Sequence, residues 1–310
     1  MKRSTFFLLI LLLGICYAAF RLLTPEPDPA FETQLIVLDT ASISMLSVLP
    51  LEVPDDEILL KREDKTWIAS QGSHSVKAPY AAVNKLLAGL THIESHYVVG
   101  KGPEEWSAGG LDPGEGIRIR VFEDDKTLED FVIGNYQAEM EGSGITYLRL
   151  WDDEAVYAVQ GALDSIFWPG FEAFRSKDFL QIDPLKVREI RWEPAEMDTA
   201  VIFRRGDSLW GQNSQVDTFL EEIKYLQGKS FVDAFDPTSD EQMLEGRITF
   251  FGTDWDAPLE VSYYRDSTRA APFIFYSTSN PDNFFESDSN GLFLELVQPF
   301  YSSFSVDSIQ

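Results

Sequence analysis

The sequence predicts an α+β protein made of two tandem repeats, each an antiparallel sheet with a helix packed on one face, behind an N-terminal transmembrane helix. Three observations predict this fold class. The order of strand-like and helical segments recurs from about residue 179, and the chain begins with a long apolar run. No glycine fingerprint of a parallel βαβ unit is present, which favours antiparallel sheets.

The recurrence is clearest around two apolar stripes. In each stripe four apolar residues fall at helical spacing, which predicts a helix with one apolar face. The first stripe is Val83, Leu86, Leu87 and Leu90, and the second is Val216, Phe219, Leu220 and Ile223. Each stripe follows a segment that we expect to be a hairpin strand carrying a tryptophan. We therefore expect the two helices to occupy equivalent positions in two copies of one unit.

The repeat sets the expected domain boundaries. Residues 1–23 form the anchor, 24–34 a proline-rich tether, 35–170 the first α+β unit and 179–310 the second. Within the units, a loop is expected at 100–106 and a short helix at 161–168, and the segment 291–297 matches that short helix. Further strands are expected where apolar residues alternate. These strands are 57–70 (a hairpin), 95–99, 117–121, 128–133, 145–150, 155–159, 200–205, 247–251, 259–264 and 273–276.

The N-terminus reads as a single-pass membrane anchor. Residues 5–23 are apolar apart from Arg21, and about 19 helical residues match a hydrocarbon core of roughly 30 Å. Lys2 and Arg3 would keep the start in the cytoplasm. This places the protein in a bacterial inner membrane, with its body in the periplasm or outside. A signal peptide cleaved near Ala18 is one alternative, and a lipoprotein signal at Cys16 is another.

Charge and cysteine usage narrow the classes of partner. Beyond residue 23 the chain carries 51 acidic and 22 basic residues, a net charge of −29. Such a surface repels nucleic acid, so no nucleic-acid partner is expected. The single cysteine lies in the apolar run, which leaves the body without thiolate ligands. The sequence predicts no cofactor and no metal.

Two short patterns imitate metal sites. His92 and His96 stand four apart, but they straddle the expected end of the first helix and have no cysteine partner. The run from Glu286 through Asp288 to Gly291 resembles the start of a calcium loop, but Val297 occupies the position of the bidentate glutamate. We interpret both as ordinary surface residues.

Trp67 and Trp210 are the site residues that we single out, as structural anchors. Each is expected on a strand close to the following helix, and a ring of that size at a sheet–helix junction removes much apolar surface from water. No catalytic residue is predicted. The 51 acidic residues make accidental carboxylate pairs common, so a carboxylate-based hydrolase stays open as an alternative.

Several of these stretches resemble a known bacterial family of membrane-anchored proteins, catalogued as domain of unknown function 4340. The resemblance covers about residues 35–190 and treats the second unit as a diverged copy. It rests on an anchor, the first helix and five motifs: Lys65-x-Trp67 after a strand and turn, Gly110-Leu-Asp-Pro113, Val132-Ile-Gly134, Tyr147-x-Arg149 and Val156-Tyr-x-Val159. The second unit lacks a counterpart of the first motif. The family implies an exported repeat protein without assigned catalytic residues, often encoded near ABC-type transporters.

Our first functional hypothesis is therefore a non-enzymatic, membrane-anchored extracytoplasmic protein. It would act as a scaffold or accessory subunit that docks an envelope complex such as an ABC-type transporter. The alternative is a periplasmic module that binds a small molecule or glycan between the two units. A cleft lined by Trp106, Trp151 or Trp255 would favour that alternative.

Overall fold

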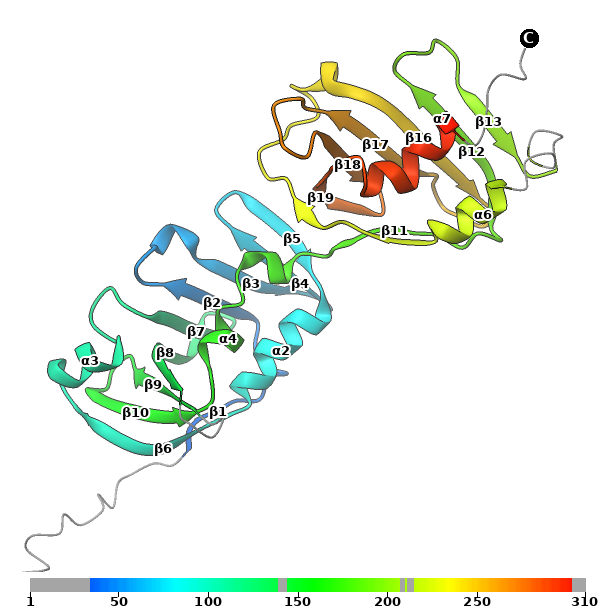
Figure 1. Cartoon of the computed structure of the whole chain (residues 1–310). Coiled ribbons are helices and arrows are strands. Elements are labelled where there is room, and N and C mark those ends of the chain that lie inside the picture. Colours follow the sequence, from blue (N-terminus) through cyan, green and yellow to red (C-terminus); the bar gives the residue numbers. More distant parts are fainter. Residues whose placement is uncertain (1–33, 139–143, 207–209, 211–214, 303–310) are drawn as a thin grey trace, which may run out of the picture. The chain divides into compact units, whose positions relative to one another are not determined.

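The computed structural model describes residues 34–138, 144–206, 210 and 215–302. The chain divides into two compact units (Figure 1). One comprises Met1–Pro54 with Lys85–Trp168, and the other comprises Asp55–Asn84 with Pro169–Gln310. The segment 55–84 thus groups with the C-terminal part of the chain. One contact within that second unit is a hydrogen bond from the Lys77 backbone N–H to the Asp282 carboxylate, 3.0 Å long.

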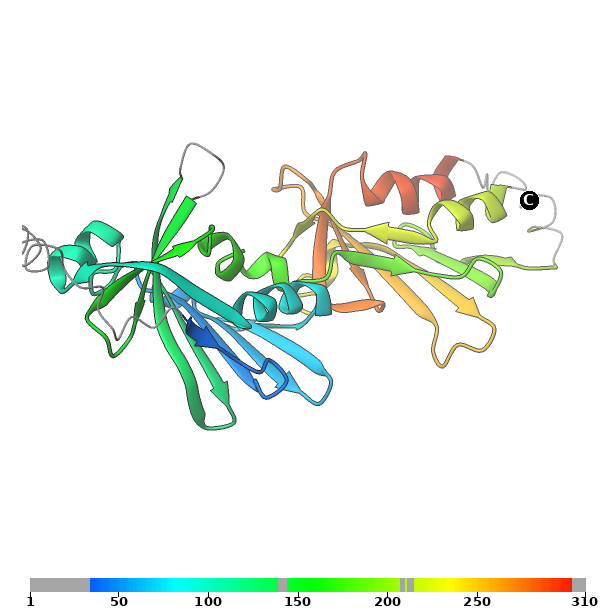
Figure 2. The ribbon, with the colours of Figure 1, turned by 90° about the horizontal axis from the view of Figure 1, so that it is seen from below.

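The longest sheet has ten strands, in the order β1-β6-β10-β9-β8-β7-β2-β3-β4-β5. Figure 2 shows these strands fanning out, the twist expected of an antiparallel sheet. The strands are β1 Gln34–Val37, β2 Met45–Pro50, β3 Ile58–Glu63, β4 Thr66–Gln71, β5 His74–Ala78, β6 His92–Lys101, β7 Ile117–Glu123, β8 Lys126–Ala138, β9 Gly144–Leu150 and β10 Ala155–Gln160.

The alternation of buried and exposed side chains explains why these segments form strands. In β3, Ile58 and Leu60 are buried and their neighbours are exposed or half-buried, as a strand with one core-facing side requires. Asp64 and Asp124 close two hairpins with φ angles of 54° and 51°. Aspartate tolerates this left-handed conformation better than most residues, so these turns form at the polar sites between strands.

Long-range pairing completes the first sheet. β2 pairs with β7, with Leu46 opposite Val121. The long strand β6 pairs with β1 on one side and β10 on the other. Three helices accompany these strands: α2 Tyr80–Leu90, α3 Pro103–Gly109 and α4 Asp164–Phe167. α4 helps to close the core, because Phe167 packs edge-on against Phe131 of β8.

The C-terminal part of the chain forms two further sheets. One has two strands, β11 and β14, and the other has seven, in the order β13-β12-β16-β17-β18-β19-β15. The strands are β11 Asp178–Gln181, β12 Val187–Pro194, β13 Val201–Arg204, β14 Tyr225–Gln227, β15 Ser230–Phe231, β16 Leu244–Gly252, β17 Leu259–Arg265, β18 Phe273–Ser277 and β19 Asn280–Ser287.

The second unit has a strongly aromatic core. Two helices, α6 Gln215–Glu222 and α7 Gln298–Ser302, contribute to it, and a π-helical segment, Phe293–Val297, precedes α7. Phe300 of α7 stacks on Trp192 and meets Phe219 of α6 edge-on, with ring centroids 5.2 and 5.5 Å apart. Burial of rings of this size supplies much of the apolar stabilisation of a unit.

The predicted fold class is wrong. The described part of the chain is mainly antiparallel sheet, in three sheets with few helices, and not two copies of a helix packed on a sheet. The physical reason is that the apolar stripes are short. They give helices of 11 and 8 residues, whereas the alternating segments lengthen and pair into broad sheets. The helices themselves are confirmed as α2 and α6, although equivalent positions in two copies are not.

Local predictions were also wrong at two places. Residue 210 is helical rather than on a strand. The expected loop at 100–106 contains the start of α3, where Pro103 at the first helical turn and two glutamates favour a helix. No helix in the described residues is long and apolar enough to cross a membrane. The predicted anchor at 5–23 lies outside the residues that the structure describes.

Candidate functional site

The candidate site lies on the face of β7, β8 and β9 that α3 covers. Phe131 and Val132 are both fully buried, but neighbouring strand residues face opposite sides. Phe131 faces α4, so Val132 faces the other side. There it forms a small apolar cluster with Leu111 and Val156, joined by the half-buried Trp106 and Tyr147.

The loop after α3 fits closely over this cluster. Gly110 ends α3 with a φ of 66°, in the left-handed region that favours glycine. The Leu111 backbone N–H then donates to the Trp106 carbonyl over 2.8 Å, which turns the Leu111 side chain into the cluster. A Cβ atom at Gly134 would overlap the Gly109 carbonyl oxygen, so the loop can approach β8 only because residue 134 is glycine.

Two arginines flank Val132 in register. Val132 is opposite Arg118 of β7 on one side and Arg149 of β9 on the other. Residues opposite each other on neighbouring strands point to the same face. The sheet therefore places two guanidinium groups beside the cluster that Trp106 covers.

The guanidinium of Arg118 is held by a carboxylate and by a tryptophan ring. Its Nε and Nη2 atoms donate to the two carboxylate oxygens of Asp130 over 2.8 and 2.6 Å. Its guanidinium also lies over the ring of Trp151, 3.3 Å from the ring centroid. A bidentate pair and a cation–π contact together fix this side chain.

Arg149 is buried, and only some of its hydrogen-bond donors have an acceptor. It is 7% exposed, and its Nη1 donates to the Trp151 carbonyl over 3.1 Å. Its guanidinium lies 4.4 Å from the Trp106 ring centroid and 5.6 Å from that of Trp151. Its Nε is buried and has no hydrogen-bond partner among the described residues. A buried donor without an acceptor is costly and uncommon.

Burial and nearby charges shift the pKa of Arg149 in opposite directions. Burial lowers the pKa of Arg149, nearby Arg118 lowers it further, and Asp130 and Asp153 oppose this. The guanidinium stays charged at neutral pH. Burial raises the pKa of Asp153, but hydrogen bonds from Tyr157 and backbone N–H groups, with nearby Lys101, lower it overall. Arg149 and Arg118 thus face Asp130 and Asp153. We call Trp106, Arg118, Asp130, Arg149 and Trp151 the Arg149 site.

A second buried arginine provides a contrast. Arg175 is 5% exposed. Its Nε donates to Asn283 over 2.8 Å, its Nη1 donates to Asp233 over 2.7 Å, and its guanidinium lies 3.9 Å from the ring centroid of Phe231. Arg175 therefore uses its donors within the fold of the second unit, whereas Arg149 leaves one unused.

The tryptophans singled out from the sequence lie elsewhere. Trp67 on β4 is 5% exposed and Trp210 is 4% exposed. Each has an arginine over its ring, Arg62 at 4.9 Å and Arg205 at 4.7 Å from the ring centroid. Trp210 also donates a hydrogen bond to Asp217 over 3.3 Å. Both rings are buried, and their role as anchors stays a prediction.

The two histidines lie on strand β6 rather than at a helix end. Four residues along a strand span roughly 13 Å, so His92 and His96 cannot share one metal ion. His92 pairs with Glu94 over 2.7 Å, and His96 packs edge-on against Tyr97. Both histidines line a pocket of about 320 Å³ with the C-terminal end of α2.

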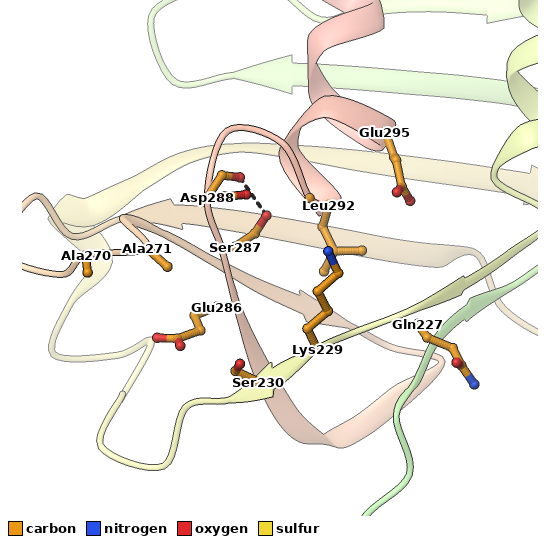
Figure 3. Close-up of a pocket in the computed structure, with 11 residues that line it drawn as sticks. Gln227, Lys229, Ser230, Ala270, Ala271, Glu286, Ser287, Asp288, Leu292 and Glu295 are labelled. Carbon is orange, nitrogen blue, oxygen red and sulfur yellow. Dashed lines mark hydrogen bonds between the residues drawn. The ribbon is translucent and has the colours of Figure 1, made fainter.

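Figure 3 shows a second pocket of about 320 Å³, in the second unit, that contains the calcium-loop pattern. The carboxylates of Glu286, Asp288 and Glu295 point in different directions and do not converge, with the Lys229 side chain extending toward Leu292. Ser287 donates its hydroxyl to the Asp288 carbonyl over 2.7 Å. Among the described residues, no three His, Cys, Asp or Glu side chains are grouped to hold a metal ion.

Comparison with family models gives one result. The model described as "Domain of unknown function (DUF4340)" matches residues 71–243, more than half of the chain. The chain belongs to the DUF4340 family. The match begins and ends further along the chain than the expected 35–190. No curated protein and no solved structure was found to match the chain.

Four of the five motifs on which the DUF4340 resemblance was based meet at the Arg149 site, whereas the fifth, Lys65-x-Trp67, lies at the start of β4. Leu111, Val132 and Val156 form its apolar floor, with Tyr147 packed against them, and Arg149 lies beside them. Sequence reasoning named Trp106, Trp151 and Arg149 separately and missed that they come together. The sequence signal for this site was the alternation of residues along β7, β8 and β9. That alternation shows which residues share a face, but only the correct pairing of these strands shows that they lie close together.

Proposed function

We propose that this DUF4340 protein is a non-enzymatic accessory subunit that docks a protein partner through the Arg149 site. The observation that carries the proposal is the buried guanidinium of Arg149, with its unused Nε donor, between two tryptophans of which Trp151 is 37% exposed. Tryptophan and arginine are the residues most enriched in the energetic centres of protein interfaces.

The setting proposed for this interaction is the bacterial envelope. The apolar run of residues 5–23 would anchor the chain in the inner membrane and leave the acidic body outside the cytoplasm. The partner would be a component of an envelope complex such as an ABC-type transporter. An anchored subunit meets membrane partners at a raised local concentration, so a modest interface suffices.

The test is position-specific photo-crosslinking in cells. A photoreactive amino acid replaces Trp151 in the full-length protein, and, as the matched control, replaces Leu185, which is 79% exposed in the second unit. We expect one discrete adduct from position 151 that is absent from position 185. Mass spectrometry then identifies the partner, and the purified partner must bind the full-length protein.

Two further results decide the proposal. Arg149→Met should abolish the adduct from position 151 while the protein level stays unchanged. No discrete adduct at position 151, an identical adduct at both positions, or an adduct insensitive to Arg149→Met would overturn docking at this site.

A further inference from the structure

We infer that Arg149 recognises a carboxylate of the protein partner, presented between Trp106 and Trp151. This inference rests on the proposed docking function and names the chemical group that the Arg149 site binds. The group is an aspartate or glutamate side chain or the C-terminus of a partner chain.

The donor geometry supports a carboxylate. A guanidinium presents Nε–H and Nη2–H as a planar fork that matches the two oxygens of a carboxylate. In Arg118 this fork is filled by Asp130. In Arg149, Nη1 donates a hydrogen bond to the Trp151 carbonyl, and Nε has no acceptor among the residues described. The edge of Arg149 that contains Nε is therefore the edge that a carboxylate fits.

Charge complementarity points the same way. Arg149 is a buried cation whose Nε–H has no acceptor among the described residues, so an anionic acceptor is the partner that complements it. The tryptophan rings on either side would shield the new ion pair from water and strengthen it.

Binding requires Trp106 to move. Arg149 Nε is shielded from solvent, and the Trp106 ring lies over the guanidinium. Trp106 stands on α3, a seven-residue helix flanked by Gly102 and Gly110, with φ angles of 91° and 66°. Its indole N–H donates to the Glu154 carbonyl over 3.0 Å. We expect this ring to shift when a carboxylate reaches Nε.

The comparison with Arg175 separates a structural from a recognition role. Replacing a buried, fully bonded charge leaves its partners unpaired, whereas replacing a poorly bonded one with an apolar residue of similar volume is often neutral or stabilising. Arg175→Met should therefore lower the melting temperature by several degrees. Arg149→Met should lower it less, because Arg149 gives up one hydrogen bond, from Nη1 to the Trp151 carbonyl, whereas Arg175 gives up two.

The experiment uses full-length protein in a non-ionic detergent with three peptides. These are acetyl-Gly-Phe-Glu-Phe-Gly-amide, its glutamine analogue, and the glutamine analogue with a free C-terminal carboxylate. Fluorotryptophan replaces the seven tryptophans, and fluorine NMR follows the Trp106 signal, which Trp106→Phe assigns. We expect the glutamate peptide to bind at least about tenfold more tightly than the neutral peptide and to shift the Trp106 signal.

The variants complete the test. Arg149→Met should remove the preference for the carboxylate, and Arg149→Lys should restore only part of it, because lysine lacks the fork. Binding by the third peptide alone would identify a chain terminus as the source. Equal binding of charged and neutral peptides, no binding at all, or a preference that survives Arg149→Met would overturn the inference. The adduct at position 151 could still form in that case, so failure of the carboxylate inference is distinguishable from failure of docking.

Discussion

At the scale of single residues, this protein separates tryptophans that are buried from tryptophans that stay near the surface. Trp67 and Trp210 are almost fully buried, each with an arginine over its ring. Trp151 is 37% exposed and contacts two arginines. Residue type alone did not distinguish these settings, because an aromatic ring serves equally as core filling and as contact surface.

We predict that Trp67→Ala and Trp210→Ala each destabilise the protein by about 3–5 kcal/mol, since each removes a large buried ring. Calorimetry of the full-length protein measures this, with Trp151→Ala as the exposed control, expected to change the melting temperature much less. A variant of Trp67 or Trp210 that keeps full thermal stability but loses partner binding would contradict the interpretation of these residues as anchors.

At the scale of elements, the local sequence pattern identified most helices and strands but not which strands pair with one another. The stripes at 83–90 and 216–223 correctly predicted α2 and α6, and the alternation at 117–121 correctly predicted β7. Pairing of β2 with β7, or of β6 with β1 and β10, joins segments far apart in the sequence. Such pairing depends on packing across the whole sheet, which local propensity does not encode. The Arg149 site depends on that pairing and was therefore missed.

The close approach of the α3 loop to β8 gives a prediction at this scale. Gly134→Ala would drive a Cβ atom into the Gly109 carbonyl, and relief requires the backbone to move. We expect a loss of about 1–3 kcal/mol, measured by denaturant unfolding. Gly100→Ala in β6 is the matched control, because the three atoms nearest to its Cβ all belong to the side chain of Glu105, which can turn away. Equal effects of the two substitutions would show that the approach to Gly109 is not tight.

At the scale of the whole molecule, the formal net charge of −26 over 310 residues means that carboxylates repel one another across the surface. Exposed ion pairs such as Lys61–Glu63 and Lys224–Glu221 contribute little. We therefore expect salt to stabilise the protein, because screening weakens the net repulsion more than it weakens these pairs.

The measurement is the melting temperature between about 0.01 M and about 1 M salt, where the screening length falls from about 30 Å to about 3 Å. A rise of about 2–5 °C is expected. Sodium and potassium chloride should act alike, since the effect follows ionic strength. A fall in melting temperature over this range would mean that attractive pairs dominate the electrostatics.

The strand order also determines where the protein can be truncated for expression. The DUF4340 match spans residues 71–243, yet β4 ends at Gln71 and β16 begins at Leu244. A recombinant fragment with those ends would lose β2, the partner of β7, and β16, the partner of β12. Two central strands would then present bare hydrogen-bonding edges and apolar faces, the usual origin of inclusion bodies. Fragments intended for crystallisation should keep residues 34–302 together.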